Sequence, residues 1–160
     1  MEVAVATQNV GGFGLEVRTN KRRGVTGPKL QYISQCVGIH GTELLVLTET
    51  RAKSIEESRS TRVKKSGMAV TMATSSGRTA AGVTVLSKSG IVYVENSSRE
   101  STPPGHYVIG AYRKGGLCMI VGGVYLDSTG QDQVGVAALQ QLSAHISELN
   151  HYQHNFDRGF

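Results

Sequence analysis

The sequence lacks several features that would place it in a specialised class of protein. Tryptophan is absent, and there are only 3 prolines and 2 cysteines among 160 residues. No apolar run approaches the ~18 residues of a membrane span. Glycine is frequent, at 20 residues, but without a Gly-X-Y period, which excludes a collagen-like chain. A hydrophobic fraction of 39% and a charged fraction of 18% predict one globular domain over residues 1–160.

The scarcity of cysteine restricts the kinds of site that the chain can carry. Cys36 and Cys118 lie far apart and outside any CxxC spacing, so neither a disulfide framework nor a zinc knuckle is expected. Both stand in apolar patterns, which is typical of buried thiols and fits a reducing, intracellular compartment. The pattern leaves nucleus and cytoplasm open. Residues 1–6 have no basic or long apolar region, so no secretory signal is expected there.

Several enzyme signatures are also missing from the sequence. There is no GxxxxGK[ST], GxSxG or HExxH motif, so P-loop NTPases, α/β-hydrolases and zincins gain no support. Five histidines are present, but none has further ligands at a spacing typical of zinc.

Positive charge is concentrated in two segments. The chain has a net charge of +5 and a pI of 9.4. Residues 18–29 contribute +5 and residues 51–65 contribute +4, so the rest of the chain is mildly acidic. Two basic connectors favour a polyanion such as DNA as partner, although solvated loops are ordinarily rich in Lys and Arg. The expected phosphate contacts are Arg22, Arg23, Arg51, Arg62, Lys64 and Lys65.

The hydropathy pattern predicts an α/β domain built on a mixed β-sheet with flanking helices. A helix beginning at Pro28 separates a strand at 2–8 from a fully apolar strand at 44–48, so these two strands should be parallel. The remaining elements are expected to form antiparallel hairpins and a final helix. Their expected bounds are 68–73, 82–86, 91–94, 107–112 and 117–125 for strands, and 131–150 for the helix.

Two polar residues stand at the carboxyl ends of the predicted parallel strands. These residues are Asn9 and Glu49, and ligands in open α/β sheets tend to bind outside such strand ends. An amide oxygen beside a carboxylate suits Mg²⁺, which prefers oxygen ligands. In the other interpretation Asn9 caps a turn, and Glu49 pairs with Arg51 or a loop lysine.

Tyr125 ends the last predicted strand. Its hydroxyl can hydrogen-bond a phosphate oxygen at such a position, although an aromatic residue there also commonly serves only for packing.

Four segments, taken in order, resemble the endonuclease/exonuclease/phosphatase superfamily with the DNase I-like fold. Within it, they are most similar to the apurinic-type endonuclease domain of non-LTR retrotransposons. Residues 6–13 (ATQNVGGF) resemble that family's "WNV-x-G" opening, and residues 45–51 (LVLTETR) its "LLLQET" strand. Residues 81–87 (AGVTVLS) resemble "GVAILS", and residues 122–127 (GGVYLD) stand where the family has "YxP".

This resemblance implies a partial four-layer α/β sandwich and a metal-dependent endonuclease that nicks DNA. It implies that Asn9 and Glu49 belong to a Mg²⁺ or Mn²⁺ site and that Tyr125 contacts the scissile phosphate. The basic connectors would then flank the face that binds DNA.

The sequence also departs from the family pattern. Thr7 and Gln8 replace the usual aromatic residue, Gly11 stands where an acidic residue is common, and Asp127 replaces the proline. The sequence ends at Phe160, before the family's "GDxN" and "SDH" motifs, so we expect the N-terminal portion of such a domain and an incomplete catalyst. A non-catalytic nucleic-acid-binding module, or a small α/β domain of another role, remains open. An apolar sheet face left uncovered would predict self-association or a missing C-terminal half.

Overall fold

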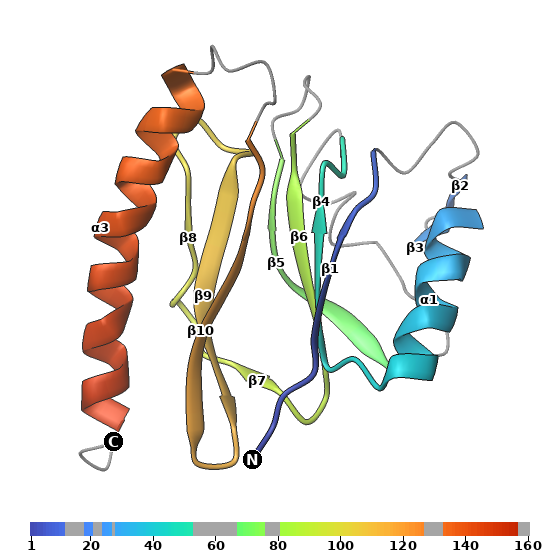
Figure 1. The fold of residues 1–160 in the computed structure, drawn as a ribbon, viewed down its shortest axis with the longest axis horizontal. Coiled ribbons are helices and arrows are strands. Elements are labelled where there is room, and N and C mark those ends of the chain that lie inside the picture. Colours follow the sequence, from blue (N-terminus) through green and yellow to red (C-terminus); the bar gives the residue numbers. More distant parts are fainter. Residues whose placement is uncertain are drawn as a thin grey trace.

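The chain folds into four layers, with a helix on each outer side of two packed sheets (Figure 1). The computed structural model describes residues 1–11, 18–20, 24–26, 28–52, 67–75, 81–126 and 133–156. The α/β class with a mixed sheet, predicted from the sequence, is confirmed, but the second sheet is a separate layer that the local patterns did not reveal. Neither helix in the described part of the chain is long and apolar enough to cross a membrane.

The first sheet has the strand order β1-β4-β6-β5. Strands β1 (Val5–Asn9) and β4 (Leu44–Thr48) are parallel, as predicted, and α1 (Pro28–His40) lies between them in the chain. Strands β6 (Val83–Lys88) and β5 (Met68–Thr74) continue the sheet antiparallel to β4. Because β4 is central, its apolar residues are buried on both faces.

The second sheet is antiparallel and is built around a long hairpin. Strand β9 (Tyr107–Lys114) pairs with β10 (Leu117–Val124) on one side and with β7 (Val92–Tyr93) on the other. The short β8 (Arg99–Glu100) also pairs with β9. Strand β8 could not be predicted from the sequence, because two polar residues carry no alternation of hydropathy.

A small hairpin is also at variance with the sequence prediction. Strands β2 (Arg18–Asn20) and β3 (Gly24–Thr26) pair with each other in a segment expected to be a loop. Three-residue strands rich in polar residues and glycine are too short to show a periodic pattern. The final helix, α3, spans Gln133–Phe156 and therefore extends beyond the predicted residue 150.

Three apolar clusters hold the layers together. Leu44, Val46 and Val85 of the first sheet pack against Val108 and Tyr112 of the second. Helix α1 covers the outer face of the first sheet, and α3 covers the outer face of the second. The expectation that one sheet face stays open is therefore wrong for these faces, because each sheet covers the inner face of the other.

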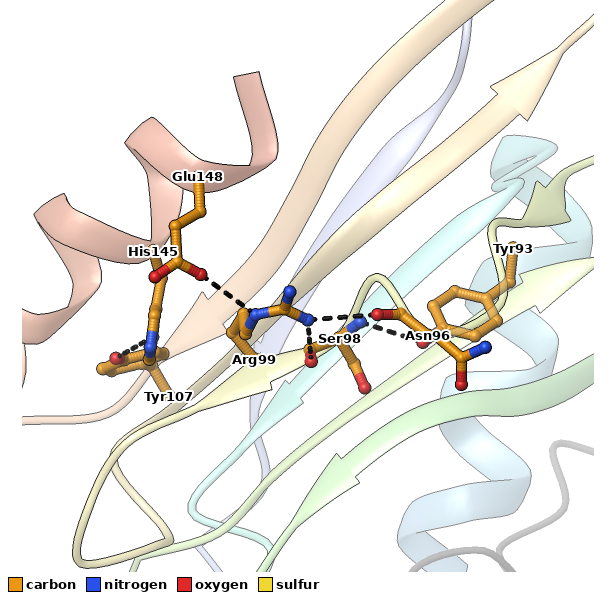
Figure 2. Close-up of polar contacts among 7 residues, drawn as sticks. All are labelled: Tyr93, Asn96, Ser98, Arg99, Tyr107, His145 and Glu148. Carbon is orange, nitrogen blue, oxygen red and sulfur yellow. Dashed lines mark hydrogen bonds and ion pairs between the residues drawn. The ribbon is translucent and has the colours of Figure 1, made fainter. Parts of the chain in front are cut away.

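Helix α3 is also held by polar contacts at a helical spacing of three to four residues. Gln141 exchanges two hydrogen bonds of 2.8 Å with the backbone of Thr102. His145 Nδ1 lies 2.7 Å from the hydroxyl of Tyr107, and Glu148 Oε2 lies 3.1 Å from Arg99 Nε. Figure 2 shows the last two contacts side by side, with Arg99 also bonded to the backbone that leads into β8. These contacts fix α3 on the second sheet.

Candidate functional site

Asn9 and Glu49 lie at the same edge of the first sheet. Asn9 is the register partner of Thr48 in the parallel pair, and Glu49 directly follows Thr48. The backbone N–H of Val10 donates to the carbonyl of Thr48 at 3.0 Å, which holds the two strand ends together. Asn9 is exposed, and the Glu49 side chain is 16% exposed. The structure therefore places the two predicted metal ligands at the adjacent ends of two paired strands.

Tyr125 reaches the same end of the molecule from the second sheet. Gly123 packs so closely on the first sheet that a Cβ there would lie 2.4 Å from Val46 Cγ1 and 3.8 Å from Thr48 Cγ2. Tyr125 follows two residues later, and Figure 1 shows β1, β4 and β10 all ending at one end of the sandwich. The three residues predicted as catalytic thus come from both sheets to one end, although Tyr125 does not belong to the sheet of the other two.

The side-chain contacts of Asn9 and Glu49 are those expected of a turn cap and of an ion pair with arginine. Asn9 Oδ1 accepts a hydrogen bond from the backbone N–H of Gly11 at 2.9 Å, which closes a turn. Glu49 Oε1 lies 2.5 Å from Arg51 Nη2, an ion pair whose arginine side chain is 51% exposed. Each candidate ligand therefore has a structural role, and any metal binding would be in addition to it.

The backbone around Glu49 adopts a conformation that L-residues rarely take. Glu49 has φ 55° and Arg51 has φ 52°, in the left-handed region that costs about 1–2 kcal/mol per non-glycine residue. Thr50, between them, is fully buried, and its N–H donates to Gly82 at 3.2 Å. The N–H of Arg51 donates to Ala81 at 3.0 Å. Left-handed non-glycine residues held by surrounding structure cluster at functional sites.

Gly82 supports this turn because only glycine fits there. Its φ is 114°, and a Cβ would lie 2.4 Å from Thr50 Oγ1. The N–H of Gly82 donates to Gly105 at 3.0 Å, and the N–H of Gly105 donates to Thr74 Oγ1 at 2.9 Å. This chain of contacts connects the Glu49 turn to the segment that precedes β9, so the two sheets share one scaffold at the site.

His106 lies beside Tyr125, a position that was not predicted from the sequence. The N–H of Tyr125 donates to the carbonyl of His106 at 2.6 Å, and His106 Nδ1 lies 3.3 Å from the carbonyl of Tyr125. The aromatic side chain of Tyr125 packs against the cluster between the sheets. The signal that would have found His106 is hairpin register, because Tyr107 pairs with Val124 and the next residues outward are His106 and Tyr125.

The donor set at this end supplies part of what a divalent cation requires. A carboxylate on Glu49 and an amide oxygen on Asn9 fit a Mg²⁺ ion that keeps water and phosphate oxygens as its other ligands. They do not form a complete protein cage, and the described residues contain no group of three His, Cys, Asp or Glu side chains able to hold a metal. The predicted phosphate contacts Arg22, Arg23, Arg62, Lys64 and Lys65 lie outside the described residues.

Comparisons with known proteins leave the family open. No family model matches the chain, and no curated protein matches it. The resemblance to the endonuclease/exonuclease/phosphatase superfamily therefore rests on the four sequence segments.

Proposed function

We propose that this chain is part of a metal-dependent endonuclease that hydrolyses phosphodiester bonds of DNA, in a domain of the DNase I-like kind. The observation that carries the proposal is that the strands preceding Asn9, Glu49 and Tyr125 all end at one end of a helix–sheet–sheet–helix sandwich. The left-handed backbone at Glu49 adds support, since non-glycine residues held in that conformation by the surrounding structure cluster at functional sites.

Glu49 and Asn9 would hold the metal ion in this proposal. Mg²⁺, or Mn²⁺, polarises the phosphoryl oxygen and stabilises the leaving oxygen when it is bound at such a site. The carboxylate supplies the charge that attracts the cation. Among the described residues, the amide oxygen of Asn9 accepts one hydrogen bond, from the N–H of Gly11, and its second lone pair would serve a further ligand.

The other residues of the site would bind the DNA backbone. The hydroxyl of Tyr125 donates to a phosphate oxygen, and the half-exposed guanidinium of Arg51 supplies a second, charged donor. The basic segment 51–65 follows Glu49 closely in the sequence, so its positive charge begins next to the site. Phosphate contacts of this kind position DNA without reading its sequence.

The test is nicking of supercoiled plasmid in the presence of Mg²⁺ or Mn²⁺. We expect slow, metal-dependent nicking that Glu49→Gln lowers at least about 100-fold, because the neutral amide holds the cation far less well. Glu95→Gln is the matched control, since Glu95 is an exposed glutamate that follows β7, and β7 pairs with the hairpin end of β9. Equal nicking by the wild type and Glu49→Gln would contradict the proposed site.

A second candidate function is DNA binding without catalysis. It is favoured by the Glu49–Arg51 ion pair and by the small number of metal-binding groups among the described residues. Fluorescence anisotropy across a salt series would measure binding. Each phosphate contact contributes a slope of about −0.9 in log K against log salt, so changing Arg22, Arg23, Lys64 and Lys65 to Ala should flatten that slope. Salt-dependent binding with no nicking by the wild type would favour this second function.

A further inference from the structure

The ion pair between Glu49 and Arg51 joins a carboxylate close to the protein body to a side chain that extends into solvent. Glu49 Oε1 lies 2.5 Å from Arg51 Nη2, and the exposed fraction of the side chain is 16% for Glu49 but 51% for Arg51. An ion pair with so exposed an arginine contributes little to stability, because water and salt screen it. The guanidinium can therefore leave the carboxylate at little cost.

The backbone under this ion pair is fixed without help from the two charged side chains. The N–H of Thr50 donates to the carbonyl of Gly82 at 3.2 Å, and the N–H of Arg51 donates to the carbonyl of Ala81 at 3.0 Å. The Thr50 side chain is fully buried between the two charged residues of the turn. The arginine side chain can thus change its partner while Glu49 stays in place.

Arg51 and a divalent cation would compete for the negative charge of Glu49. The proposed function assigns this carboxylate to the metal ion, and the present inference rests on that assignment. Two cations held by one carboxylate lie within a few ångströms of each other and repel. Because Mg²⁺ carries twice the charge of a guanidinium, occupation of Glu49 by the metal favours departure of Arg51.

A phosphate group is the partner that a released Arg51 fits best. A guanidinium presents its N–H donors in a planar fork that matches phosphate oxygens, and it keeps its charge at any ordinary pH. While Arg51 is paired with Glu49, the local charge is balanced and the carboxylate repels an approaching phosphate. Neutralisation of the carboxylate by a cation removes both obstacles.

We propose that Arg51 is a phosphate-binding residue that the metal ion controls. It pairs with Glu49 in the metal-free state and turns to a phosphate of the DNA backbone when a divalent cation occupies the carboxylate. Metal and DNA then bind cooperatively, because each favours the arrangement in which the ion pair is open. The metal-free site holds DNA weakly, so substrate is retained mainly where the metal is present.

The metal-free half of the proposal is tested by a double-mutant cycle in EDTA. Fluorescence anisotropy gives the Kd of a labelled DNA duplex at low salt for the wild type, Glu49→Gln, Arg51→Gln and the double variant. The loss of affinity caused by Arg51→Gln should be at least about threefold larger in the Glu49→Gln background, where the arginine is released, than in the wild type. Equal losses in both backgrounds, as expected of two charges acting independently, would overturn the proposal.

The effect of the metal is tested with the same duplex in Mg²⁺. Arg51→Gln should weaken DNA binding about tenfold in Mg²⁺, because a charged contact with phosphate is lost, and much less in EDTA. Arg113→Gln is the matched control, since Arg113 is exposed and lies in β9 near the β9–β10 turn. Its effect should be the same with and without Mg²⁺. A loss for Arg51→Gln that Mg²⁺ does not enlarge would overturn the proposal.

Metal affinity without DNA provides a third measurement. The electron paramagnetic resonance signal of free Mn²⁺ gives its Kd, which should be about two- to fivefold lower for Arg51→Gln than for the wild type, because the competing guanidinium is gone. Arg113→Gln should bind Mn²⁺ as the wild type does. Equal Mn²⁺ affinity of wild type and Arg51→Gln would overturn the proposal. If Arg51→Gln does not fold, Arg51→Asn replaces it, because asparagine tolerates a left-handed backbone.

Failure of this proposal can be told apart from failure of the proposed function. If Mn²⁺ binding and nicking depend on Glu49 while the loss caused by Arg51→Gln is the same in EDTA and in Mg²⁺, the endonuclease assignment stands and metal control of Arg51 is wrong. If the wild type binds neither Mn²⁺ nor DNA, both are wrong.

Discussion

Glu49 Oε1 lies 2.5 Å from Arg51 Nη2 across a turn in which both residues have a left-handed backbone. The buried Thr50 between them anchors the turn, and its neighbours Ala81 and Gly82 accept the backbone hydrogen bonds. The carboxylate is thus presented by a turn that backbone hydrogen bonds hold in a left-handed conformation. Such strain costs stability, and residues held in this way cluster at functional sites.

Glu49→Gly is expected to abolish the proposed function without lowering the stability of the fold. Glycine adopts a φ of 55° without strain, which offsets the lost ion pair and the greater freedom of the unfolded chain. The free energy of unfolding should stay unchanged or rise by up to about 1 kcal/mol. Metal-dependent nicking or metal-enhanced DNA binding should be lost. Urea denaturation and the plasmid assay measure the two effects.

The control for this variant is Thr48→Gly, one residue earlier. Thr48 is part of β4, so glycine there should lower the free energy of unfolding by about 0.5–1 kcal/mol. If Glu49→Gly destabilises the fold as much as Thr48→Gly does, the left-handed turn is not a source of strain.

Gly123→Ala should wedge the two sheets apart at the site. The new Cβ would lie 2.4 Å from Val46 Cγ1 and 2.6 Å from Val83 Cγ1, and both valines are buried in the cluster between the sheets. We expect a loss of about 1–3 kcal/mol in the free energy of unfolding. Gly116→Ala is the matched control, because nothing lies within 4 Å of its Cβ, and it should change stability by less than about 0.5 kcal/mol.

Glu43→Gln should remove part of the acid sensitivity of the fold. Glu43 Oε1 lies 2.7 Å from Lys114 Nζ, and the hydrogen bond to Lys114 is the main reason why the pKa of Glu43 falls below its usual 4.5. A lowered carboxyl pKa in the folded state gives stability that is present above pH 4.5 and lost as the pH falls through the folded pKa. Below pH 4.5, the free energy of unfolding from denaturation curves should therefore fall less steeply with decreasing pH for Glu43→Gln than for the wild type. An equal dependence on pH would contradict this assignment.

Tyr112→Phe should remove part of the alkaline sensitivity. Burial between the sheets raises the pKa of Tyr112 above its usual 10.0, although a hydrogen bond of 2.6 Å with Thr71 partly opposes the shift. The folded state then holds a proton that the unfolded state releases, so stability is present below pH 10.0 and is lost as the pH rises above it. Denaturant unfolding above pH 10.0 should show a smaller decline for Tyr112→Phe. A decline as steep for Tyr112→Phe as for the wild type would contradict the prediction.

Elements with a strong hydropathy pattern could be predicted from the sequence, but their assembly into two sheets could not. β4 was predicted with the observed bounds because a short, continuous apolar run is typical of a strand buried on both faces. The division into two sheets depends on contacts such as that between Gly123 and Val46, which are distant in sequence and have no local signature. For the same reason, Tyr125 was predicted to share a sheet with Asn9, whereas it approaches from the opposite layer.

The candidate site could likewise be predicted only in part from the sequence. The placement of Asn9 beside Thr48 followed from parallel pairing, which the intervening helix made predictable. The conformation of Glu49 did not follow, because its left-handed backbone is imposed by Gly82 and by the buried Thr50, and glutamate itself has no preference for it. His106 was also missed because its position depends on hairpin register and not on its own neighbours.

The attachment of α3 has a consequence for the order in which the chain folds. Gln141, His145 and Glu148 bond to partners that are 39, 38 and 49 residues earlier in the sequence. The β9–β10 hairpin, by contrast, closes over two residues and forms locally. Since long-range contacts are reached only after the entropy of closing large loops is lost, the hairpin should form first and α3 should dock late. Amide hydrogens of α3 should accordingly exchange by partial opening more readily than those of β9.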